Sequence, residues 1–427
     1  MKRAAFLRGL WIADLAWLAV AILIATFRVF GVLMPWLATT PTGTLMPSVG
    51  LTVGGALIAM FITYRSGEGT IPRPSYGQAI AIVGTTMTVT AVGLVISREY
   101  FSREWLLVTF VLWAAQMLAH RTLLRMRPWS ESMVVVTQEK TLADGINESP
   151  HATVIATVAP DSDPSLIPLA DDMTLVIDLR ATMSDEMARF VSSASISGQR
   201  VVPLVAVYEE YTGRLPLVHI LRGWEISRPV ARSRYAPFKR VLDATLTVVT
   251  APIWLLIGAF VWSAVRMESD GAAIYRQTRV GKNGKLFTLL KFRTMVVDAE
   301  ALGPQFAQQN DPRLTRIGRF LRRSRLDEIP QLWNVLKGDL AIVGPRPERP
   351  VFVETFTRAI PFYDSRHLVR PGITGWAQVH RGYGGGIDDA LDKLTYDLYY
   401  VKHSSLWLDT QILGKTVWIV VTGKGSR

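Results

Sequence analysis

The chain has 427 residues, enough for about three domains of ~150 residues each. Apolar residues make up 49% and charged residues only 19%, and the mean hydropathy is +0.23, which is typical of a membrane protein and excludes a disordered or collagen-like chain. The chain has no cysteine, which excludes disulfides, thiolate metal sites and cysteine nucleophiles. Its net charge of +12 favours anionic lipid, phosphate-bearing substrates or nucleic acid as partners.

The first part of the chain holds four apolar stretches, Leu10–Phe30, Thr44–Tyr64, Gly77–Ser97 and Trp105–His120. A helix of ~20 residues crosses a bilayer core of ~30 Å, so we predict a bundle of four transmembrane helices over residues 1–128. Lysine and arginine gather at the N-terminus, in the second loop and after the fourth stretch, which predicts that both ends face the cytoplasm. Asp14 lies within the first stretch, close to the interface, and we expect it to be structural.

Residues 129–208 alternate short β-rich runs with helix-length polar pieces, which predicts a small Rossmann-like α/β domain. It lacks the cofactor fingerprint, because Thr137–Lys140 follows the first strand where a glycine-rich turn would be needed. Asp161 and Asp163 form an Asp-x-Asp pair, as in metal-dependent glycosyltransferases, but the flanking prolines favour a surface turn. Residues 209–236, rich in glycine, proline and arginine, are a predicted linker.

A fifth uncharged stretch, Ala244–Val265, is long enough to cross a bilayer. Pro252 lies near its middle, where proline removes a backbone donor and kinks a helix. Basic residues flank both ends, which favours a re-entrant helix over 239–266 that enters and leaves one leaflet. A spanning helix is the alternative.

The remaining residues, 237–427, carry most of the positive charge. Six arginines lie between Arg313 and Arg325, and several share one helical face that suits a lipid phosphate or a pyrophosphate; adhesion to anionic lipid is the simpler alternative. Asp327 and Glu328 follow, with Asp327 as the predicted N-cap of a helix. A carboxylate there, among arginines, is expected to stay ionised, which suits a nucleophile at phosphorus or a Mg²⁺ ligand; a capping box with incidental charges is the alternative.

Four motifs follow one another in this region: Lys291–Met295, Leu326–Leu336, Gly344–Pro350 and Arg366–Val379. Together they closely resemble the bacterial sugar transferase family, the monotopic phosphoglycosyl transferases, over residues 237–427. Four N-terminal helices followed by an α/β domain look like the large subclass of that family, and Tyr208–Gly213 is also similar to it. The resemblance implies an α-rich cytoplasmic catalytic domain joined to the re-entrant helix.

The resemblance also implies an activity. The family transfers a hexose-1-phosphate, here expected to be glucose or galactose, from a UDP-sugar to undecaprenyl phosphate and releases UMP. This is the first step of exopolysaccharide, capsule or O-antigen assembly, at the cytoplasmic face of the bacterial inner membrane. Asp327 is implied to be the nucleophile, which forms an aspartyl-phosphosugar intermediate, and Glu328 completes the acidic pair. Mg²⁺ is implied to bridge Asp327 and the diphosphate.

Other matched positions are expected to bind substrate: Lys291, Arg293, Arg322, Arg346, Arg370, Thr374, Trp376 and Gln378. Trp376 is expected to stack on uracil, with core packing as an equal alternative. The matched positions at the membrane element are Lys239, Arg240, Asp243 and Pro252. There, an Arg–Asp pair is expected to tie the re-entrant helix to the domain. The family commonly has Ser-Pro at the break, whereas this chain has Ala251-Pro252, so the hydroxyl that would satisfy a freed carbonyl is missing.

Partners and rival functions complete these expectations. Membrane lipid is an expected partner, nucleic acid is not, and the apolar N-terminal unit is compatible with a homodimer. One rival function is a metal-dependent membrane glycosyltransferase that uses Asp161 and Asp163. The other is an inactive scaffold of a polysaccharide assembly complex, against which the intact Asp327-Glu328 pair argues. The sequence does not identify the sugar, the pathway or the role of the α/β domain.

Overall fold

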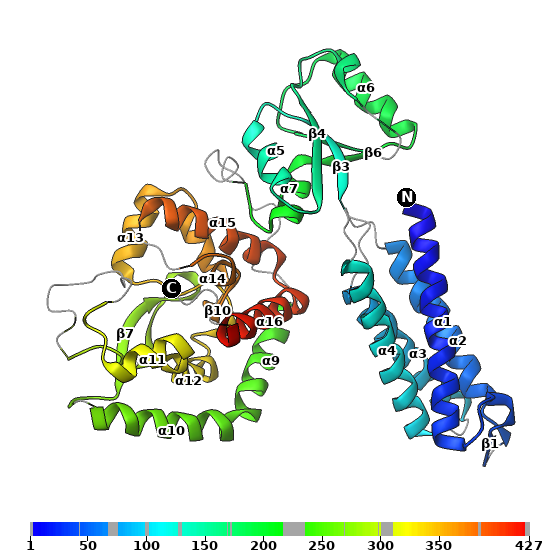
Figure 1. Cartoon of the computed structure of the whole chain (residues 1–427), viewed down its shortest axis with the longest axis horizontal. Helices are drawn as coiled ribbons and strands as arrows, with labels where there is room; N and C mark the ends of the chain where they lie inside the picture. Colours follow the sequence, from blue (N-terminus) through cyan, green and yellow to red (C-terminus); the bar gives the residue numbers. More distant parts are fainter. Residues whose placement is uncertain are drawn as a thin grey trace. The chain divides into compact units, whose positions relative to one another are not determined.

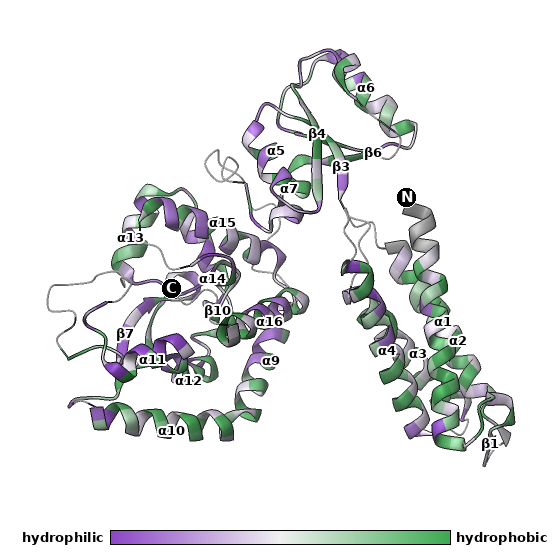
Figure 2. Cartoon of the chain, viewed as in Figure 1, coloured by the Kyte–Doolittle hydropathy of each residue, from purple (hydrophilic) through white to green (hydrophobic). Residues whose placement is uncertain are grey.

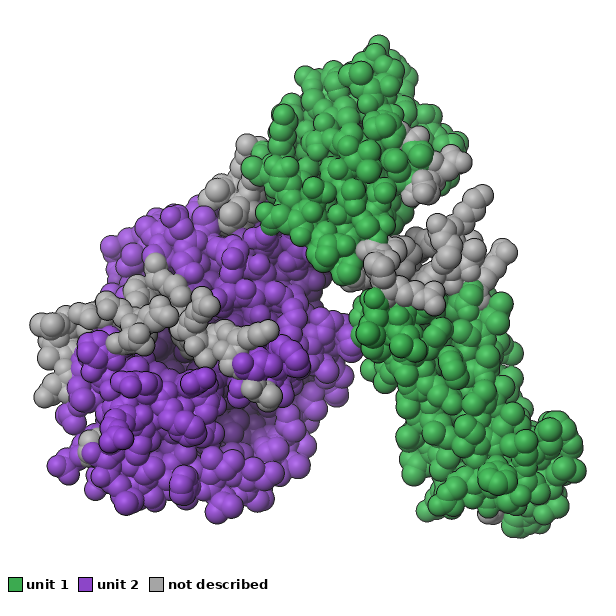
Figure 3. Space-filling model, viewed as in Figure 1, with its two compact units in different colours: residues 1–207 green, residues 208–427 purple. Residues whose placement is uncertain are grey.

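The computed structural model describes residues 3–41, 43–66, 76–98, 102–126, 130–168, 170, 173–216, 235–268, 270–297, 299, 311–382 and 386–422. The chain divides into two compact units, Met1–Val207 and Tyr208–Arg427, which Figure 3 distinguishes by colour. Most of the predicted basic linker over 209–236 lies outside the described residues.

The first unit begins with four long apolar helices: α1 (Arg3–Phe30), α2 (Met46–Ser66), α3 (Tyr76–Ser97) and α4 (Arg103–Met126). A short 3-10 turn (Pro35–Leu37) and a minimal hairpin of β1 (Thr39–Thr40) and β2 (Gly43–Thr44) join α1 to α2. The four helices share one apolar core, in which Trp105 and Trp113 are fully buried. In the described part of the chain, five helices are long and apolar enough to cross a membrane: these four and α10. Much of α4 and α10 is green in Figure 2, and the predicted membrane-protein class is confirmed at this level.

Asp14 is tied to two other helices inside this core. Both of its carboxylate oxygens accept from Arg121 of α4, at 3.0 and 2.9 Å, and both side chains are 0% exposed. The Tyr64 hydroxyl of α2 donates to the same carboxylate at 2.5 Å. A charge buried among apolar helices is costly unless it is paired, and here the pair is complete. This arrangement agrees with the structural role expected for Asp14.

The α/β domain follows with a four-stranded parallel sheet in the order β4-β3-β5-β6. Its strands are β3 (Glu131–Val136), β4 (Ala152–Val158), β5 (Thr174–Ile177) and β6 (Arg200–Pro203). Its helices are α5 (Lys140–Asn147), α6 (Asp185–Ile196) and α7 (Leu204–Thr212). The central strands β3 and β5 are runs of buried residues, as expected of parallel strands covered on both faces. The mixed α/β architecture predicted for this segment is therefore confirmed.

The second unit begins with a helical hairpin of α9 (Tyr235–Val249) and α10 (Ala251–Glu268), which meet at a sharp bend in Figure 1. Pro252 lies in the first turn of α10, where a missing backbone N–H costs least. Side chains donate to carbonyls just before the bend: the Trp254 indole donates to Thr247 at 2.9 Å, and the Thr250 hydroxyl donates to Leu246 at 2.8 Å, whose carbonyl also accepts from the Thr250 amide.

The long helix α10 has two different faces. Val261 and Val265 are buried against Phe292 and Leu321 of the domain. On the opposite side an apolar stripe is left exposed, and Phe260 has 77% of its surface accessible. The apolar helix thus lies along the domain, to which it is attached by one face.

The start of α9, at the foot of the hairpin, is attached to the domain by other contacts than those predicted. The expected Arg–Asp pair is replaced by Lys239, which lies 3.4 Å from Asp243 and donates to Asp409 at 2.6 Å. Arg240 instead donates to the carbonyls of Val335 and Leu336. Both basic residues are within one helical turn of Asp243, but the donors of Arg240 are engaged by these carbonyls at the end of α12, which leaves Lys239 as the partner of Asp243.

The rest of the second unit is mainly helical. Its strands are β7 (Ile274–Val280) and β8 (Leu286–Phe292), which form an antiparallel hairpin closed by a 3-10 turn (Lys282–Gly284), and the parallel pair β9 (Ala341–Val343) and β10 (Gly372–Thr374). Its α-helices are α11 (Arg316–Ser324), α12 (Gln331–Lys337), α13 (Pro350–Ala359), α14 (Trp376–His380), α15 (Ile387–His403) and α16 (Leu406–Thr422). Two further 3-10 segments are η5 (Leu326–Glu328) and η6 (Tyr363–Leu368).

Candidate active site

The acidic pair lies in η5, between α11 and α12. Arg325 adopts a left-handed conformation (φ 56°) that ends α11 and turns the chain into η5. Asp327 is therefore not the predicted N-cap of α12, because that position is held by Pro330. Leu326 and Ile329, on either side of the pair, pack into the core that α10 shares with β8. The acids are thus anchored directly on the exposed apolar hairpin.

Asp327 lies among basic side chains. Its carboxylate is 9% exposed and interacts electrostatically with Lys291, Arg322 and Arg346. No hydrogen bond or ion pair to Asp327 is found among the described residues. A buried carboxylate that lies among cations and that no described residue engages is suited to react.

Burial and the neighbouring Glu328 charge raise the pKa of Asp327 to about 6, and the surrounding cations oppose this shift. The sequence predicted that this carboxylate would stay ionised among the arginines. Burial outweighs the cations in the direction of the pKa shift, but not by enough to neutralise the group at pH 7. At neutral pH most of the carboxylate is still ionised, because its pKa lies below 7. Burial and neighbouring arginines lower the pKa of Lys291 to about 8, which leaves that side chain mainly protonated at pH 7.

Glu328 is held by two arginines. Arg346 Nη1 lies 3.2 Å from Oε1, and Arg325 Nη1 lies 3.9 Å from Oε2. Glu328 therefore neutralises and orients Arg346 beside Asp327. Neither contact involves Asp327, so the two acids of the pair have different surroundings.

The Lys291–Met295 motif distributes its side chains in different directions. Lys291 acts on Asp327, whereas Phe292 is buried in the core. Thr294 accepts from Arg322 Nε at 3.0 Å and so orients that guanidinium. Arg293, predicted to bind substrate, instead donates to the carbonyl of Asp270 at 2.6 Å, in the turn after α10.

Arg370 has a structural contact as well. Its Nε donates to the carbonyl of Gly338 at 3.1 Å, where a left-handed glycine (φ 94°) ends α12. Arg240 donates to two carbonyls of the same helix end. Arginines at a helix C-terminus satisfy free carbonyls and oppose the negative end of the helix dipole. The two arginines therefore stabilise the helix that follows the acidic pair.

The last three predicted substrate-binding residues lie on β10 and α14. Trp376 is buried, its indole donates to the Gly213 carbonyl at 2.6 Å, and it stacks on Tyr399. This geometry fits the core-packing alternative. Thr374 exchanges a hydrogen bond with Thr416 at 2.7 Å, and Gln378 Nε2 donates to Ile373 at 3.2 Å. The Gln378 carbonyl oxygen is buried and has no hydrogen-bond partner among the described residues.

Sequence reasoning missed several residues of the catalytic domain. Asp409 accepts from Lys239 and from the hydroxyls of Tyr235 and Tyr400. Arg279 and Arg366 hold the loop that carries Arg346, as described below. Arg366 is the first residue of the motif Arg366–Val379, and this position could have identified it as functional. No local sequence pattern indicates a role for Asp409 or Arg279.

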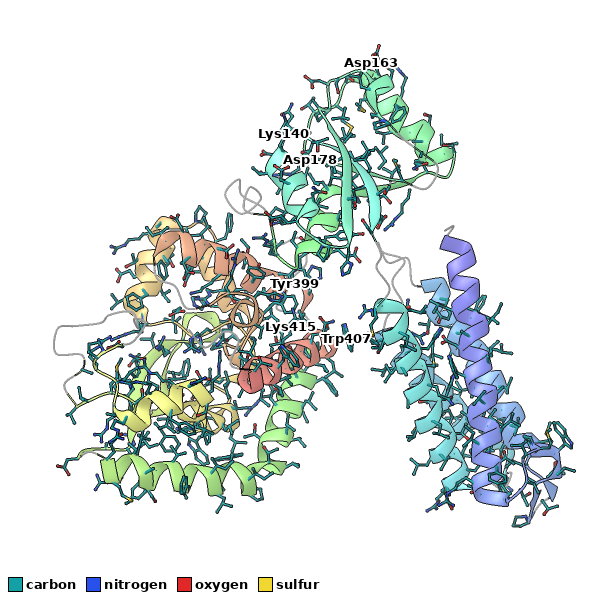
Figure 4. All side chains as sticks on the ribbon, viewed as in Figure 1. Lys140, Asp163, Asp178, Tyr399, Trp407 and Lys415 are labelled. Carbon is teal, nitrogen blue, oxygen red and sulfur yellow. The ribbon has the colours of Figure 1, made fainter. Side chains whose placement is uncertain are left out.

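The rival Asp-x-Asp pair has a local role. Asp163 accepts from the Ser165 amide at 2.8 Å and caps a 3-10 turn (Pro164–Leu166), and this hydrogen bond lowers its pKa. Figure 4 labels Asp163 on the α/β domain. No cluster of three or more His, Asp or Glu side chains suited to hold a metal occurs among the described residues. The surface-turn interpretation fits these contacts.

A buried carboxylate that no described residue engages, with cations around it and an exposed apolar helix beside it, suits phosphate-bearing substrates. The profile described as bacterial sugar transferase matches residues 234–423. A UDP-N-acetylgalactosamine-undecaprenyl-phosphate N-acetylgalactosaminephosphotransferase of Aeromonas hydrophila is 40% identical over 59% of this chain and 60% of its own length. The UDP-glucose:undecaprenyl-phosphate glucose-1-phosphate transferase of Caulobacter vibrioides is 42% identical over 43% of this chain and 70% of its own length. The enzyme of the same name from Escherichia coli (strain K12) is 41% identical over 42% of this chain and 38% of its own length.

The chain therefore belongs to the bacterial sugar transferase family. The family and the enzyme class predicted from the motifs, a phosphoglycosyl transferase, are thereby confirmed. The Aeromonas alignment covers about three fifths of that relative, and the Escherichia alignment about two fifths.

Proposed function

We propose that the protein transfers a sugar-1-phosphate from a UDP-sugar to undecaprenyl phosphate and releases UMP, as the initiating step of a cell-surface polysaccharide. The observation that carries this proposal is the buried Asp327 carboxylate, which has no hydrogen-bond or ion-pair partner in the part of the chain that the structure describes. Three cations act on it, and they suit two anionic substrates that must approach each other. The printed activities of the relatives support the same reaction.

The reaction is proposed in two displacements. An Asp327 oxygen attacks the phosphorus that carries the sugar, and the bond from that phosphorus to the bridging oxygen breaks, so that UMP leaves with the bond electrons. An oxygen of undecaprenyl phosphate then attacks the same phosphorus and displaces Asp327. The product is undecaprenyl diphosphosugar, and the carboxylate is regenerated. A covalent intermediate of this kind predicts ping-pong kinetics.

The basic residues neutralise the anions during both displacements. Lys291 comes from β8 and Arg322 from α11, yet both act on Asp327. Arg346 is proposed to contact the diphosphate while Glu328 holds its guanidinium in place. Positioning and charge neutralisation supply most of the catalysis in phosphoryl transfer, which suits this collection of side chains.

Mg²⁺ fits this site only in part. Mg²⁺ takes one or two carboxylates together with substrate phosphates, and Asp327 offers a carboxylate that no described residue engages. Glu328 is already paired with two arginines. Asp327 would thus hold the ion together with the diphosphate, and the ion would supply charge neutralisation at the phosphate oxygens. The surrounding cations predict weak binding without substrate.

The hairpin of α9 and α10 is proposed to be re-entrant. One face of α10 packs on the domain through Val261 and Val265, which a helix crossing the whole bilayer away from the domain would not do. In this cysteine-free chain, Asp270→Cys and Asp161→Cys should both react with an impermeant thiol reagent from the same, cytoplasmic side. Reaction of the two cysteines from opposite sides would show that the hairpin spans.

The reaction is tested with the full chain in nanodiscs, Mg²⁺, undecaprenyl phosphate and UDP-glucose, UDP-galactose or UDP-N-acetylgalactosamine. The wild type should release UMP with one of these donors, Asp327→Asn should not, and Asp161→Asn should be active. Release of UDP, or loss of turnover in Asp161→Asn alone, would favour a metal-dependent glycosyltransferase. No release with any donor would leave the scaffold alternative.

A further inference from the structure

The loop that carries Arg346 is held by its carbonyl oxygens. Residues 344–350 contain three prolines, which have no N–H to donate, so the loop cannot be fixed by donors at those positions. The four consecutive carbonyls of residues 345–348 instead accept hydrogen bonds from three elements, β10, η6 and β7. The Gly372 amide donates to Pro345 at 2.9 Å, and the Val280 amide donates to Glu348 at 3.0 Å.

The buried Arg366 and the partly buried Arg279 hold the two carbonyls between them. Arg366 Nη2 donates to the carbonyl of Arg346 itself at 3.0 Å. Arg279 Nη1 donates to the next carbonyl, that of Pro347, at 2.9 Å. The two arginines come from different elements, η6 and β7, so side chains of two elements hydrogen-bond the backbone around Arg346.

Both arginines are themselves immobilised. Arg366 donates through Nε and Nη2 to Asp397 of α15, at 3.1 and 2.6 Å, and through Nη1 to the Tyr363 hydroxyl at 2.7 Å. Arg279 donates twice to Gln277, at 3.0 and 2.6 Å, and lies 3.5 Å from Glu348. A planar guanidinium uses several donors in a fixed geometry, which lysine does not reproduce.

We infer that Arg366 and Arg279 are positioning residues, which act on the reaction by fixing the loop from which Arg346 reaches Glu328 beside Asp327. Neither contributes a hydrogen bond to the acidic pair. Their effect passes through two backbone carbonyls to one guanidinium, whose contact with Glu328 is 3.2 Å. This inference rests on the proposed function, because it assigns a role toward the same reaction.

The test is a double-mutant cycle in the full chain. Arg366→Lys should lower kcat/KM for UMP release by roughly 10- to 100-fold, because small displacements of a positioned group are costly. In an Arg346→Ala background the same change should have an effect of less than about twofold, since the group being positioned is gone. Arg279→Lys should behave in the same way and serves if Arg366→Lys fails to fold. Arg358→Lys, at an exposed arginine of α13, is the matched control and should match the wild type.

Additive losses in the Arg346→Ala background would overturn the inference, as would full activity of both lysine variants. Hydrogen exchange provides a readout that does not depend on turnover. The amides of Arg346, Glu348 and Arg349 should exchange faster in Arg366→Lys than in the Arg358→Lys control, and unchanged exchange would contradict the loop anchoring. If the wild type itself released no UMP, the proposed function would fail. The hydrogen-exchange rates would still show whether Arg366 anchors the loop that carries Arg346.

Discussion

Lys239 of α9 donates to Asp409 of α16 at 2.6 Å, although 170 residues separate them in the chain. Tyr235 and Tyr400 donate to the same carboxylate, at 2.5 and 2.8 Å, and Lys239 also lies 3.4 Å from Asp243. One lysine therefore serves two buried acids at the foot of the apolar hairpin. The hairpin is joined to the domain by charge here and by apolar contacts along α10.

Lys239→Met should destabilise the protein by roughly 3–5 kcal/mol, because it leaves two buried carboxylates without their cation. Burial already raises the pKa of Asp243, which shows how little solvent reaches this site. Thermal unfolding of the full chain in nanodiscs measures the effect. Lys393→Met is the matched control, because that lysine pairs with Asp389 at a partly exposed position and should cost less than ~1 kcal/mol. Equal losses in both variants would contradict the anchoring role.

Asp327→Asn should stabilise the folded protein while it abolishes turnover. The pKa of Asp327 is raised to about 6, so the ionised form is less favourable in the fold than in the unfolded chain. At pH 7 the neutral amide removes this cost, which we expect to gain roughly 1–3 kcal/mol. The gain should shrink as the pH falls through 6 and disappear below 4, where the wild-type carboxyl is protonated in both states. Thermal midpoints of both proteins between pH 4 and 8 test this, and a destabilised variant at pH 7 would contradict it.

The same pKa predicts the acidic limb of the pH–rate profile. Turnover needs the Asp327 carboxylate, so the wild-type rate should rise with pH around a midpoint near 6. Glu328→Gln removes a negative neighbour that raises this pKa, so the residual activity should have its midpoint at a lower pH. Single-turnover UMP release against pH measures both midpoints. A shift to higher pH in the variant would show that Glu328 does not act on Asp327 in this way.

Asp14 and Arg121 should matter for stability and not for chemistry. Asp14→Leu leaves a buried arginine unpaired and should cost roughly 3–5 kcal/mol, and Arg121→Leu should cost a similar amount. The double leucine variant should be more stable than either single variant, because no charge is left buried. Thermal unfolding gives the three values, and UMP release per folded molecule should equal that of the wild type. Loss of turnover in a well-folded double variant would instead give the pair a catalytic role.

Gly213→Ala should loosen the packing around Trp376. Gly213 has a φ of +66°, and a methyl group there would lie 3.0 Å from the indole ring whose N–H its carbonyl accepts. Strain and crowding together should cost roughly 2–4 kcal/mol in thermal unfolding. Gly198→Ala is the control, since that glycine also has a positive φ (+86°) but open space around it, and only the conformational cost of ~1 kcal/mol is expected. Equal losses of stability in the two variants would mean that the Trp376 side chain moves aside without an energetic cost.

The aromatic residues next to Trp376 extend this packing. The Tyr399 ring stacks on Trp376 with 5.9 Å between ring centroids, and the Lys415 ammonium lies 4.7 Å from the centroid of the Trp376 ring. Lys415 Nζ also lies 2.6 Å from His380 Nε2, and burial lowers the pKa of His380 to about 4. His380 is therefore neutral at pH 7 and accepts from the lysine.

The sequence by itself determined the elements and the family. In a long apolar run, the backbone polar groups can be hydrogen-bonded away from water when the run forms a buried or membrane-embedded helix. The helices α1–α4 were therefore predictable from hydropathy, and the break between α9 and α10 was predictable from Pro252. Motif order alone identified the acidic pair and the arginines near it. Local pattern suffices wherever the cause of a structure lies within one or two turns of the chain.

Only the tertiary structure decided which charged residues meet. Arg293 and Arg370 belong to the same motifs as Lys291, yet their guanidinium groups bind backbone carbonyls. Asp14 with Arg121, and Lys239 with Asp409, are pairs of residues more than 100 positions apart in the chain. The upward shift in the pKa of Asp327 likewise follows from burial. Burial and long-range pairing are properties of the packed chain, so no local sequence pattern encodes them.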